Sequence, residues 1–492
     1  MLHNTIFTHS KKKSVNYFYN IQKKICCIAH PFLYNAYLAD RSKQTIKQFE
    51  SNSISENNAK YYLKKYAFLK SKHFFKTFQY SKQVDSSVSE YEIENQLINL
   101  KNIVFEVTDA CNLRCKYCGY GELYCDYDER KDKYLSIETV KEILIYIKPY
   151  ISKSNGILTI GFYGGEPLLN IRLIKETVLF VKENNMNRKI KFNMTTNAVL
   201  LDKYIDFLYQ NNFTLLVSID GNEKNHSYRV FQSGENSFNK VYQNLLLVKE
   251  KYPSYFETNV SFNTVLHNRN SIDESHSFLY NTFKKNTQLS PLNNIGIKAE
   301  KIDQFQTLYY DLSKNLNIVE NRKQLIEERF TGDPMVLSVA TFINSRIKNA
   351  SYNKYEELLA SEASKKFGLT GTCLPFQRKI FITVNGKILP CERIGQEFSI
   401  GSITNNGIDL NLKEIANTYS HFFSKIKKQC TLCYHLESCL QCIFQIKDFK
   451  TRCVCHGFVN EETFSNELSS VFNFLESHSH LFQKIIREVI LK

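Results

Sequence analysis

The chain has 492 residues, 43% of them hydrophobic, and its aromatic side chains are 30 Tyr and 36 Phe without any Trp. This length and composition indicate a globular protein of several structural units and exclude a disordered chain or a disulfide-stabilised miniprotein. The net charge of +15 favours anionic partners in general, but the lysines are scattered, and no basic stripe interleaved with aromatic residues predicts a nucleic-acid surface.

The first residues along the chain indicate where the protein works. The N-terminal twenty residues are partly basic but lack the apolar run of a secretory signal. No later segment reaches the roughly eighteen uninterrupted apolar residues of a membrane span. We therefore expect a cytoplasmic protein with no membrane partner.

Residues 1–97 are rich in aromatic side chains and predict a small N-terminal unit. Residues 57–75 have helical periodicity, and a polar, Ser-rich stretch near residues 81–92 separates this unit from the next. The core that follows, residues 98–290, alternates short β-rich runs with longer amphipathic ones. The runs that predict strands are residues 102–108, 157–164, 189–197, 214–220 and 257–265.

This alternation is typical of parallel strands joined by crossover helices, and so of an α/β fold. Polar and Gly-rich residues follow the strands, at the edge of the sheet where parallel α/β proteins place their sites. After the core, residues 291–370 predict a mostly helical connection, residues 371–460 are rich in cysteine, and residues 461–492 predict an amphipathic C-terminal helix.

The chain has 14 Cys, and in a reducing compartment this number favours metal or redox chemistry over disulfides. Cys111, Cys115 and Cys118 fall in one short loop after the first predicted strand, spaced C-x3-C-x2-C. Three thiolates can hold an iron–sulfur cluster and leave one iron open to a ligand. The alternative is a zinc knuckle whose fourth ligand is Cys125 or a distant His.

This loop resembles the C-x3-C-x-φ-C motif of the radical S-adenosylmethionine (SAM) superfamily, with Tyr117 as the aromatic residue φ. The resemblance implies a partial (β/α)6 barrel, a [4Fe-4S] cluster on the three cysteines, and SAM bound to the open iron. It also implies reductive cleavage of SAM to a 5'-deoxyadenosyl radical that abstracts a hydrogen atom from the substrate.

Motifs after the later strands resemble the same superfamily in the expected order. Gly164, Gly165, Glu166 and Pro167 resemble its GGEP motif, which holds the methionine amino group. Thr195, Thr196 and Asn197 resemble the segment near the ribose. Residues 218–221 resemble the SxDG stretch of the peptide-modifying branch, which implies that Ser218 contacts the ribose and Arg229 the methionine carboxylate. The branch usually continues to HDxxR, but here Asn225 and His226 occupy the His and Asp positions.

The second cysteine region resembles the SPASM domain, which binds two auxiliary four-iron clusters in peptide-modifying radical enzymes; two structural zinc sites are the alternative. Two residues separate Cys439 from Cys442, where the SPASM pattern has three. The resemblance implies that Cys373, Cys391 and Cys442 hold the nearer auxiliary cluster, with an open fourth position. It assigns the other cluster to Cys430, Cys433, Cys439 and Cys455, with Cys453 as the weaker choice for the last ligand.

Glu392 directly follows Cys391, at the position of a catalytic Asp in the anaerobic sulfatase-maturing relatives. A carboxylate there could accept the proton released on substrate oxidation. The alternative role is a structural ion pair with Arg393.

These features together favour a radical SAM oxidoreductase that modifies a ribosomally made precursor peptide, by forming a thioether or a related side-chain cross-link. Residues 28–80 are similar to the N-terminal units of such maturases, which implies binding of a leader peptide. A reducing donor of the flavodoxin or ferredoxin type is implied as well. The alternatives are a sulfatase-maturing enzyme that forms formylglycine and, more remotely, a zinc-bearing nucleic-acid-binding protein.

Overall fold

The computed structural model describes residues 1–42, 56–80, 84–125, 127–184, 186–309, 330, 333–347, 369–446, 449 and 451–489. It divides into two compact units, each assembled from segments that are distant in the chain. One unit comprises residues 87–328 and 372–421, and the other comprises residues 1–86, 329–371 and 422–492. We call them the barrel unit and the terminal unit. This grouping cuts across the domain boundaries expected from the sequence, because the cysteine-rich region contributes to both units.

The barrel unit is built on one large sheet. Its described residues form ten strands in the order β11-β10-β9-β8-β7-β6-β12-β13-β14-β15. Six consecutive parallel strands make up the first part: β6 Asn102–Thr108, β7 Leu158–Gly164, β8 Ile190–Thr196, β9 Thr214–Ser218, β10 Val260–Leu266 and β11 Thr287–Pro291. This arrangement confirms the expected α/β fold, and β6 to β10 lie where the sequence predicts them.

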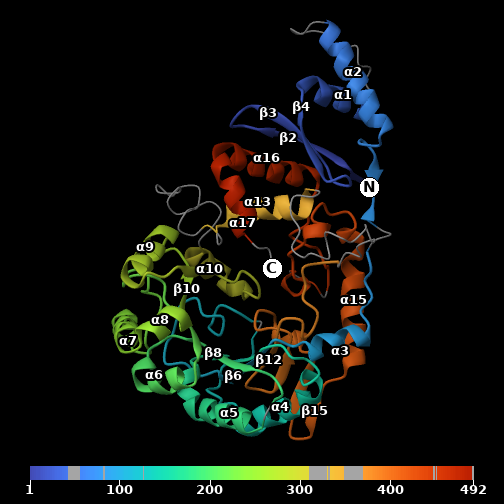
Figure 1. Cartoon of the computed structure of the whole chain (residues 1–492). Helices are drawn as coiled ribbons and strands as arrows, with labels where there is room; N and C mark the ends of the chain where they lie inside the picture. Colours follow the sequence, from blue (N-terminus) through green and yellow to red (C-terminus); the bar gives the residue numbers. More distant parts are fainter. Residues whose placement is uncertain are drawn as a thin grey trace. The chain divides into compact units, whose positions relative to one another are not determined.

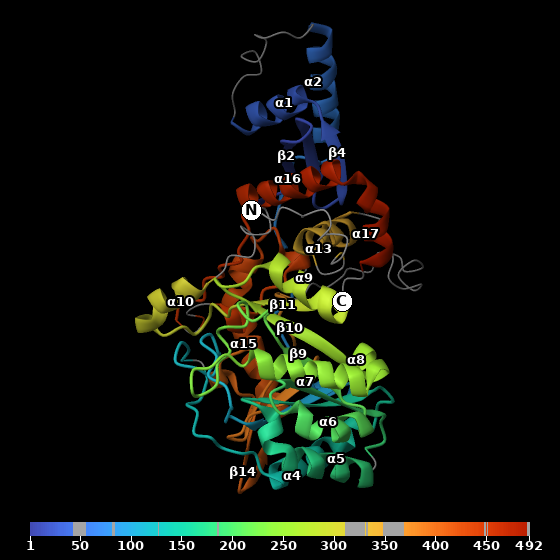
Figure 2. The ribbon, with the colours of Figure 1, turned by 90° about the vertical axis from the view of Figure 1, so that its left-hand side faces the viewer.

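Helices follow the strands and cover the sheet on its outer side (Figures 1 and 2). Each buries one apolar stripe, as Val140, Ile143 and Ile147 show in the first crossover helix. The helices of this part are α3 Glu90–Ile98, α4 Ile137–Ile151, α5 Ile171–Glu183, α6 Leu201–Gln210, α7 Phe238–Lys251, α8 Pro253–Asn259, α9 Ile272–Phe283 and α10 Ile302–Leu308. Most of the helical connection expected at residues 291–370 lies outside the described residues.

The sheet continues beyond β6 through short strands of the cysteine-rich region. β12 Ile380–Ile382 pairs parallel to β6, and the chain then returns in antiparallel steps through β13 Lys387–Leu389, β14 Gly401–Thr404 and β15 Gly407–Asp409. The first part of the cysteine-rich region is therefore an extension of the barrel sheet. Helix α15 Leu412–Cys430 begins in this unit and ends in the other.

The terminal unit contains a three-stranded antiparallel sheet, β2 Thr5–Ser10, β3 Val15–Asn20 and β4 Ile25–Ala29. A core that includes Phe18, Leu33, Tyr37 and Tyr66 joins the sheet to two helices. Its remaining elements are β1 Leu2–His3, β5 Thr77–Phe78, α1 Pro31–Arg41, α2 Glu56–Ser71, α13 Pro334–Thr341, α16 Glu461–Ser477 and α17 Phe482–Glu488. The expected C-terminal helix is thus two helices.

No helix in the described ranges has the length and apolar character that a bilayer crossing requires.

Candidate active site

Cys111, Cys115 and Cys118 lie on a loop that leaves the carboxyl end of β6. Asp109 begins the loop, and its carboxylate accepts hydrogen bonds from the backbone N–H groups of Lys131 and Lys133 at 3.0 and 2.6 Å. The backbone N–H groups of Arg114 and Lys116 donate to the residue 230 and residue 228 carbonyls. These bonds fix the loop to two other segments, so the cysteines occupy a defined position at the sheet edge.

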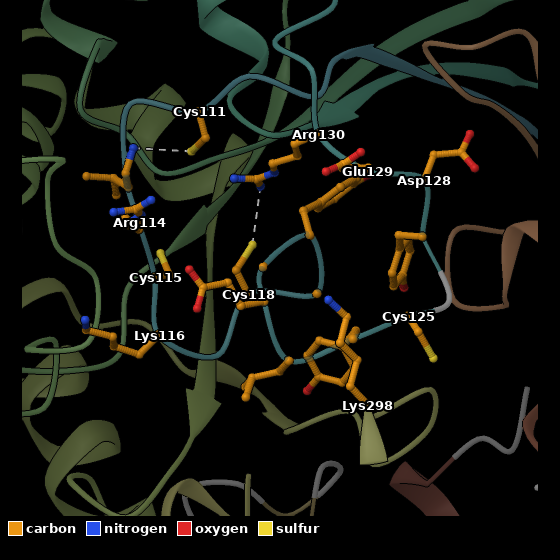
Figure 3. A pocket seen from close by; sticks show the side chains of 18 of the residues that line it. Cys111, Arg114, Cys115, Lys116, Cys118, Cys125, Asp128, Glu129, Arg130 and Lys298 are labelled. Carbon is orange, nitrogen blue, oxygen red and sulfur yellow. Dashed lines mark hydrogen bonds between the residues drawn. The ribbon is translucent and has the colours of Figure 1, made fainter. Parts of the chain in front are cut away.

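Two cavities that share part of their lining open at this loop. The inner cavity, about 170 Å³, is lined by all three cysteines and by residues that follow successive strands, and the outer cavity, about 1010 Å³, shares the cysteines and extends toward Cys125 and Lys298 (Figure 3). The predicted site residues that line the inner cavity are Cys111, Cys115, Cys118, Gly164, Gly165, Thr195, Thr196, Asn197, Ser218, Arg229 and Glu392. The structure therefore brings most of the predicted site to one cavity, although Tyr117, Glu166 and Pro167 are not part of its lining.

Two of the three thiols, those of Cys111 and Cys118, receive hydrogen bonds within the described contacts. The Leu113 N–H and the Asn197 amide donate to Cys111 Sγ at 3.4 and 3.7 Å. Burial raises the pKa of Cys111 to about 11 and that of Cys115 to about 12. Cluster binding at this loop must therefore displace protons from the thiols.

The GGEP motif needs glycine at its first two positions because the backbone of the cysteine loop lies too close to leave room for a Cβ. Gly164 has φ +128°, and a Cβ there would lie 2.2 Å from the residue 108 carbonyl oxygen; a Cβ on Gly165 would lie 2.0 Å from the residue 110 carbonyl oxygen. The N–H groups of residues 165 and 166 donate to these same two oxygens at 2.9 Å. The motif thus clamps the end of β7 against the stem of the cysteine loop and leaves bare backbone facing the cavity.

Glu166 is buried behind the cavity lining and does not line the cavity itself. Its fully buried carboxylate accepts hydrogen bonds from the Leu168 N–H, the Thr196 hydroxyl and the Asn197 N–H at 3.1, 2.8 and 2.7 Å. Burial nevertheless raises its pKa to about 7. Both oxygens have partners, so Glu166 positions Asn197, whose amide in turn reaches Asn112 and Cys111.

A buried network connects Asp220 after β9 with Arg229 and Tyr117. Arg229 donates through Nε and Nη2 to the two oxygens of Asp220 at 2.9 and 3.0 Å, and the Tyr117 hydroxyl donates to the same carboxylate. The Arg229 guanidinium also lies 5.4 Å from the centre of the Tyr117 ring. Burial alone would raise the pKa of Asp220, but the charge of Arg229 holds it below the usual range.

This network changes the expectation for Arg229. Two of its five N–H groups are occupied by Asp220, so the Nε–Nη2 side of the guanidinium is not available to a second carboxylate, and only the Nη1 end could contact one. The Asp of the HDxxR pattern is replaced here by His226, and the carboxylate that pairs with Arg229 is instead Asp220 of the SxDG stretch. His226 is buried and bridges the Asp220 N–H at 3.3 Å and the Ser237 hydroxyl at 3.1 Å, and desolvation lowers its pKa to about 3.

Glu392 lines the inner cavity, and its ion pair is not the expected one. Both carboxylate oxygens lie 3.0 Å from Lys379 Nζ. The ion pair of Glu392 is therefore with Lys379, and the alternative pairing with Arg393 is wrong. Lys379 immediately precedes β12 and Glu392 follows β13, and these two strands are antiparallel neighbours in the sheet. Glu392 is held at the cavity by Lys379 through its carboxylate and by the Tyr127 hydroxyl, which donates to its backbone carbonyl at 3.2 Å.

Sequence reasoning missed Arg130 and Tyr120, which line both cavities. Arg130 Nη2 donates to Cys118 Sγ at 3.4 Å, and its guanidinium carbon lies 5.1 Å from the centre of the Tyr120 ring (Figure 3). Arg130 is twelve residues beyond the last cysteine of the loop in a polar stretch. No local pattern distinguishes it from a surface arginine.

The second cysteine region contributes one thiol-lined cavity that lies within the terminal unit. Four thiols line it together with Gln441 and the residue 457 backbone: Cys430, Cys433, Cys439 and Cys455. Cys453 is not part of this lining. The structure thus brings together the set expected for one auxiliary cluster. Cys373 and Cys391 belong to the barrel unit and Cys442 to the terminal unit.

The two sets of cysteines suit iron–sulfur clusters better than single metal ions. In the described ranges, no three His, Cys, Asp or Glu side chains converge closely enough to hold one metal ion. A four-iron cluster is wider than an ion, so its ligands surround a cavity, as the two sets of cysteines do. In the inner cavity, bare Gly backbone and polar side chains stand beside the thiols, which suits a small polar cosubstrate.

Comparison with known proteins gives two family matches. Residues 105–279 match the Radical SAM superfamily, and residues 373–443 match the SPASM iron–sulfur cluster-binding domain. The chain is similar to a cysteine-type anaerobic sulfatase-maturating enzyme of Clostridium perfringens, with 25% identity over 69% of this chain and 87% of the relative. It is also similar to the radical SAM cyclopropyl synthase TigE of Paramaledivibacter caminithermalis, with 31% identity over 34% of this chain and 35% of the relative.

The fold has solved counterparts as well. A structure of native anSMEcpe with bound AdoMet and Kp18Cys peptide has a TM-score of 0.52 and 18% identity, covering 79% of this chain and 99% of that chain. Among the curated relatives, matches cover 48% of a sulfatase-maturating enzyme from Clostridium novyi and 35% of TigE. The chain therefore spans about half the length, or less, of several relatives that it matches.

Proposed function

Because the chain contains a radical SAM domain and a SPASM domain, we propose that it is a maturase that modifies a ribosomally made precursor peptide. The observation that carries the proposal is the inner cavity, where the three cysteines meet residues from the ends of successive parallel strands. When bound there, a four-iron cluster with SAM supplies the 5'-deoxyadenosyl radical that removes a hydrogen atom from substrate. The protein supplies the site, the orientation and the proton acceptor.

The proposed roles follow from the contacts. Cys111, Cys115 and Cys118 hold the cluster, and three ligands leave one iron open. The bare backbone of Gly164 and Gly165 accommodates the amino acid part of SAM at close range. Further contacts come from the polar side chains beside it, Asn197, Ser218 and the remaining Arg229 nitrogen.

Glu392 is the proposed proton acceptor. Its carboxylate lies at the inner cavity, and Lys379 keeps it oriented through two contacts of 3.0 Å. A positioned carboxylate can take the proton of a substrate thiol or carbon as the new bond forms. The proposed linkage is a thioether or a related side-chain cross-link. For a thioether, a hydrogen atom leaves the carbon, a proton leaves the thiol, and the remaining electron would pass to an auxiliary iron–sulfur cluster.

The auxiliary clusters are proposed on the remaining cysteines. Cys430, Cys433, Cys439 and Cys455 hold one cluster, supported by their common cavity. For the second, we propose the other three SPASM cysteines, Cys373, Cys391 and Cys442. A flavodoxin- or ferredoxin-type protein is the proposed electron donor.

The terminal unit is the proposed leader-binding element. Serine side chains of α16 donate to two backbone carbonyls of β2, Ser465 to Phe7 at 2.7 Å and Ser469 to His9 at 2.6 Å. At the opposite edge of this sheet, β4 pairs with β3 on one side, and no strand of the described residues pairs with its other side; its Ile28 is 71% exposed. An extended peptide could add to this edge by backbone hydrogen bonds.

The test is anaerobic incubation of the reconstituted enzyme with SAM, dithionite and short peptides encoded beside its gene. We expect 5'-deoxyadenosine and a peptide that has lost hydrogen but kept its sulfur. A sulfatase-derived peptide tests the second candidate, favoured by the similarity to sulfatase-maturating enzymes, because formylglycine formation from Cys removes the sulfur. Formation of 5'-deoxyadenosine with every peptide unchanged in mass would contradict both activities.

A further inference from the structure

Arg130 makes a contact with the cysteine loop that the proposed function does not use. Its Nη2 donates to Cys118 Sγ at 3.4 Å, and Figure 3 shows the side chain extending from beyond the loop toward that sulfur. Cys111 receives its hydrogen bonds from a backbone N–H and an amide, which are neutral. Arg130 is thus the one cationic side chain that donates to a sulfur of the three cysteines within the described contacts.

The surroundings of Arg130 hold its charge at this position. The guanidinium lies over the Tyr120 ring with 5.1 Å between its carbon and the ring centre, an arrangement that a planar cation favours. Its Nε is buried and has no hydrogen-bond partner, and no carboxylate of the described residues pairs with it. An arginine kept for an ion pair would have such a carboxylate, so the position is better explained by the sulfur.

We propose that Arg130 is a positioning residue that raises the reduction potential of the cluster on Cys111, Cys115 and Cys118. Reduction adds one negative charge to the cluster, and a nearby cation stabilises the reduced form more than the oxidised form. A hydrogen bond to a ligand sulfur acts in the same direction because it withdraws electron density. The proposal rests on the cluster assignment made under the proposed function.

The chain offers a matched control in Arg114. It is an exposed arginine of the cysteine loop that lines the outer cavity, but its only hydrogen bond given by the structure comes from its backbone N–H. Arg130→Met and Arg114→Met therefore remove the same charge from the same cavity, and only the first also removes a donor to sulfur. Arg130→Lys keeps the charge and loses the planar fork.

The experiment is a redox titration of each reconstituted protein, followed by the electron paramagnetic resonance signal that changes when SAM is added. That signal separates the proposed SAM-site cluster from auxiliary clusters. We expect Arg130→Met to have a more negative midpoint potential than wild type, Arg130→Lys to be intermediate, and Arg114→Met to shift clearly less. Iron content and the Kd for SAM are measured on the same samples.

Two results would overturn the proposal. One is equal midpoint potentials for Arg130→Met and Arg114→Met; the other is weaker SAM binding by Arg130→Met at an unchanged potential, which would make Arg130 a ligand contact. If Arg130→Met does not retain iron, the comparison of Arg130→Lys with Arg114→Lys decides by the same criterion. A wild-type protein without any SAM-responsive signal would instead refute the cluster assignment itself.

Discussion

Replacing Asp220 with Asn removes the negative charge from the buried pair with Arg229 and keeps the volume of the side chain. The Asp220 side chain has 0% exposure and that of Arg229 has 8%. The carboxylate accepts from Arg229 Nε and Nη2, from the Val265 N–H at 3.0 Å and from the Tyr117 hydroxyl. In the variant, an NH2 group must face at least one of these donors.

The size of the effect follows from what remains buried. Removing one partner of a buried ion pair leaves an uncompensated charge and costs about 3–5 kcal/mol. The control is Asp202→Asn, which breaks a 2.8 Å pair with Lys240 whose side chains are 29% and 43% exposed. Solvent-screened pairs of this kind contribute about 0.2–1 kcal/mol. The two Asp→Asn changes should therefore differ several-fold in their effect on unfolding free energy.

The assay is urea unfolding of the metal-free proteins followed by circular dichroism, with hydrogen exchange to locate the weakened segments. We expect Asp220→Asn to lower the transition midpoint and to increase exchange around residues 113–118 and 225–230. The double variant Asp220→Asn with Arg229→Met should recover part of the loss, because no unpaired charge remains. Equal stability of the Asp220 and Asp202 variants would refute the reasoning.

The same pair gives a pH dependence with a definite sign. Arg229 lowers the pKa of Asp220 below its unfolded value of 3.8, so the unfolded state binds a proton first as the pH falls. The stability from the pair is complete above pH 3.8 and decreases below it. Wild type should therefore lose more stability than Asp220→Asn when acidified below pH 3.8.

Further predictions concern the proton acceptor, the auxiliary ligands, the motif glycines and the leader edge. Glu392→Gln should reduce peptide modification by about 100-fold or more while 5'-deoxyadenosine still forms, measured by mass spectrometry and chromatography. Cys455→Ser should lower iron and sulfide per chain, whereas Cys453→Ser should leave both unchanged. Gly165→Ala places a Cβ 2.0 Å from a backbone oxygen and should reduce cluster retention, with Gly119→Ala, where the nearest atom is 3.6 Å away, as the control. Ile28→Asp at the β4 edge should raise the Kd for precursor peptide without changing 5'-deoxyadenosine formation.

The sequence predicts the barrel strands well because each is a short run of apolar and β-branched residues with at least one buried face. β6 runs from Asn102 to Thr108, as expected from its apolar and β-branched residues, and the next four strands lie within a few residues of their predicted bounds. The pattern is local, so a single sequence contains it. The extension through β12 is different, since Ile380–Ile382 is three residues long and pairs with a strand far back in the chain.

The site is predictable to the same degree and for the same reason. Cysteine spacing and the GGEP motif are local features, and the structure brings the three cysteines and the two motif glycines to one cavity. The partners of the charged residues are not local. Arg229 pairs with Asp220 instead of standing free, and Glu392 pairs with Lys379 across neighbouring strands. A short spacing pattern identifies the residues of a site but does not show which of their polar atoms already bind other protein groups.

This distinction affects how the proposed SAM site should work. Glu166 and Asp220 are the two carboxylates of the downstream motifs, and both are fully buried with their oxygens bonded to protein donors. Neither is free to meet a cosubstrate directly. Their bonds instead fix Asn197 and Arg229, which do line the cavity. Glu166→Ala and Asp220→Ala should therefore raise the Kd for SAM through the position of the neighbouring residue, whereas Glu166→Gln, which can still accept from the Asn197 N–H, should bind SAM more tightly than Glu166→Ala.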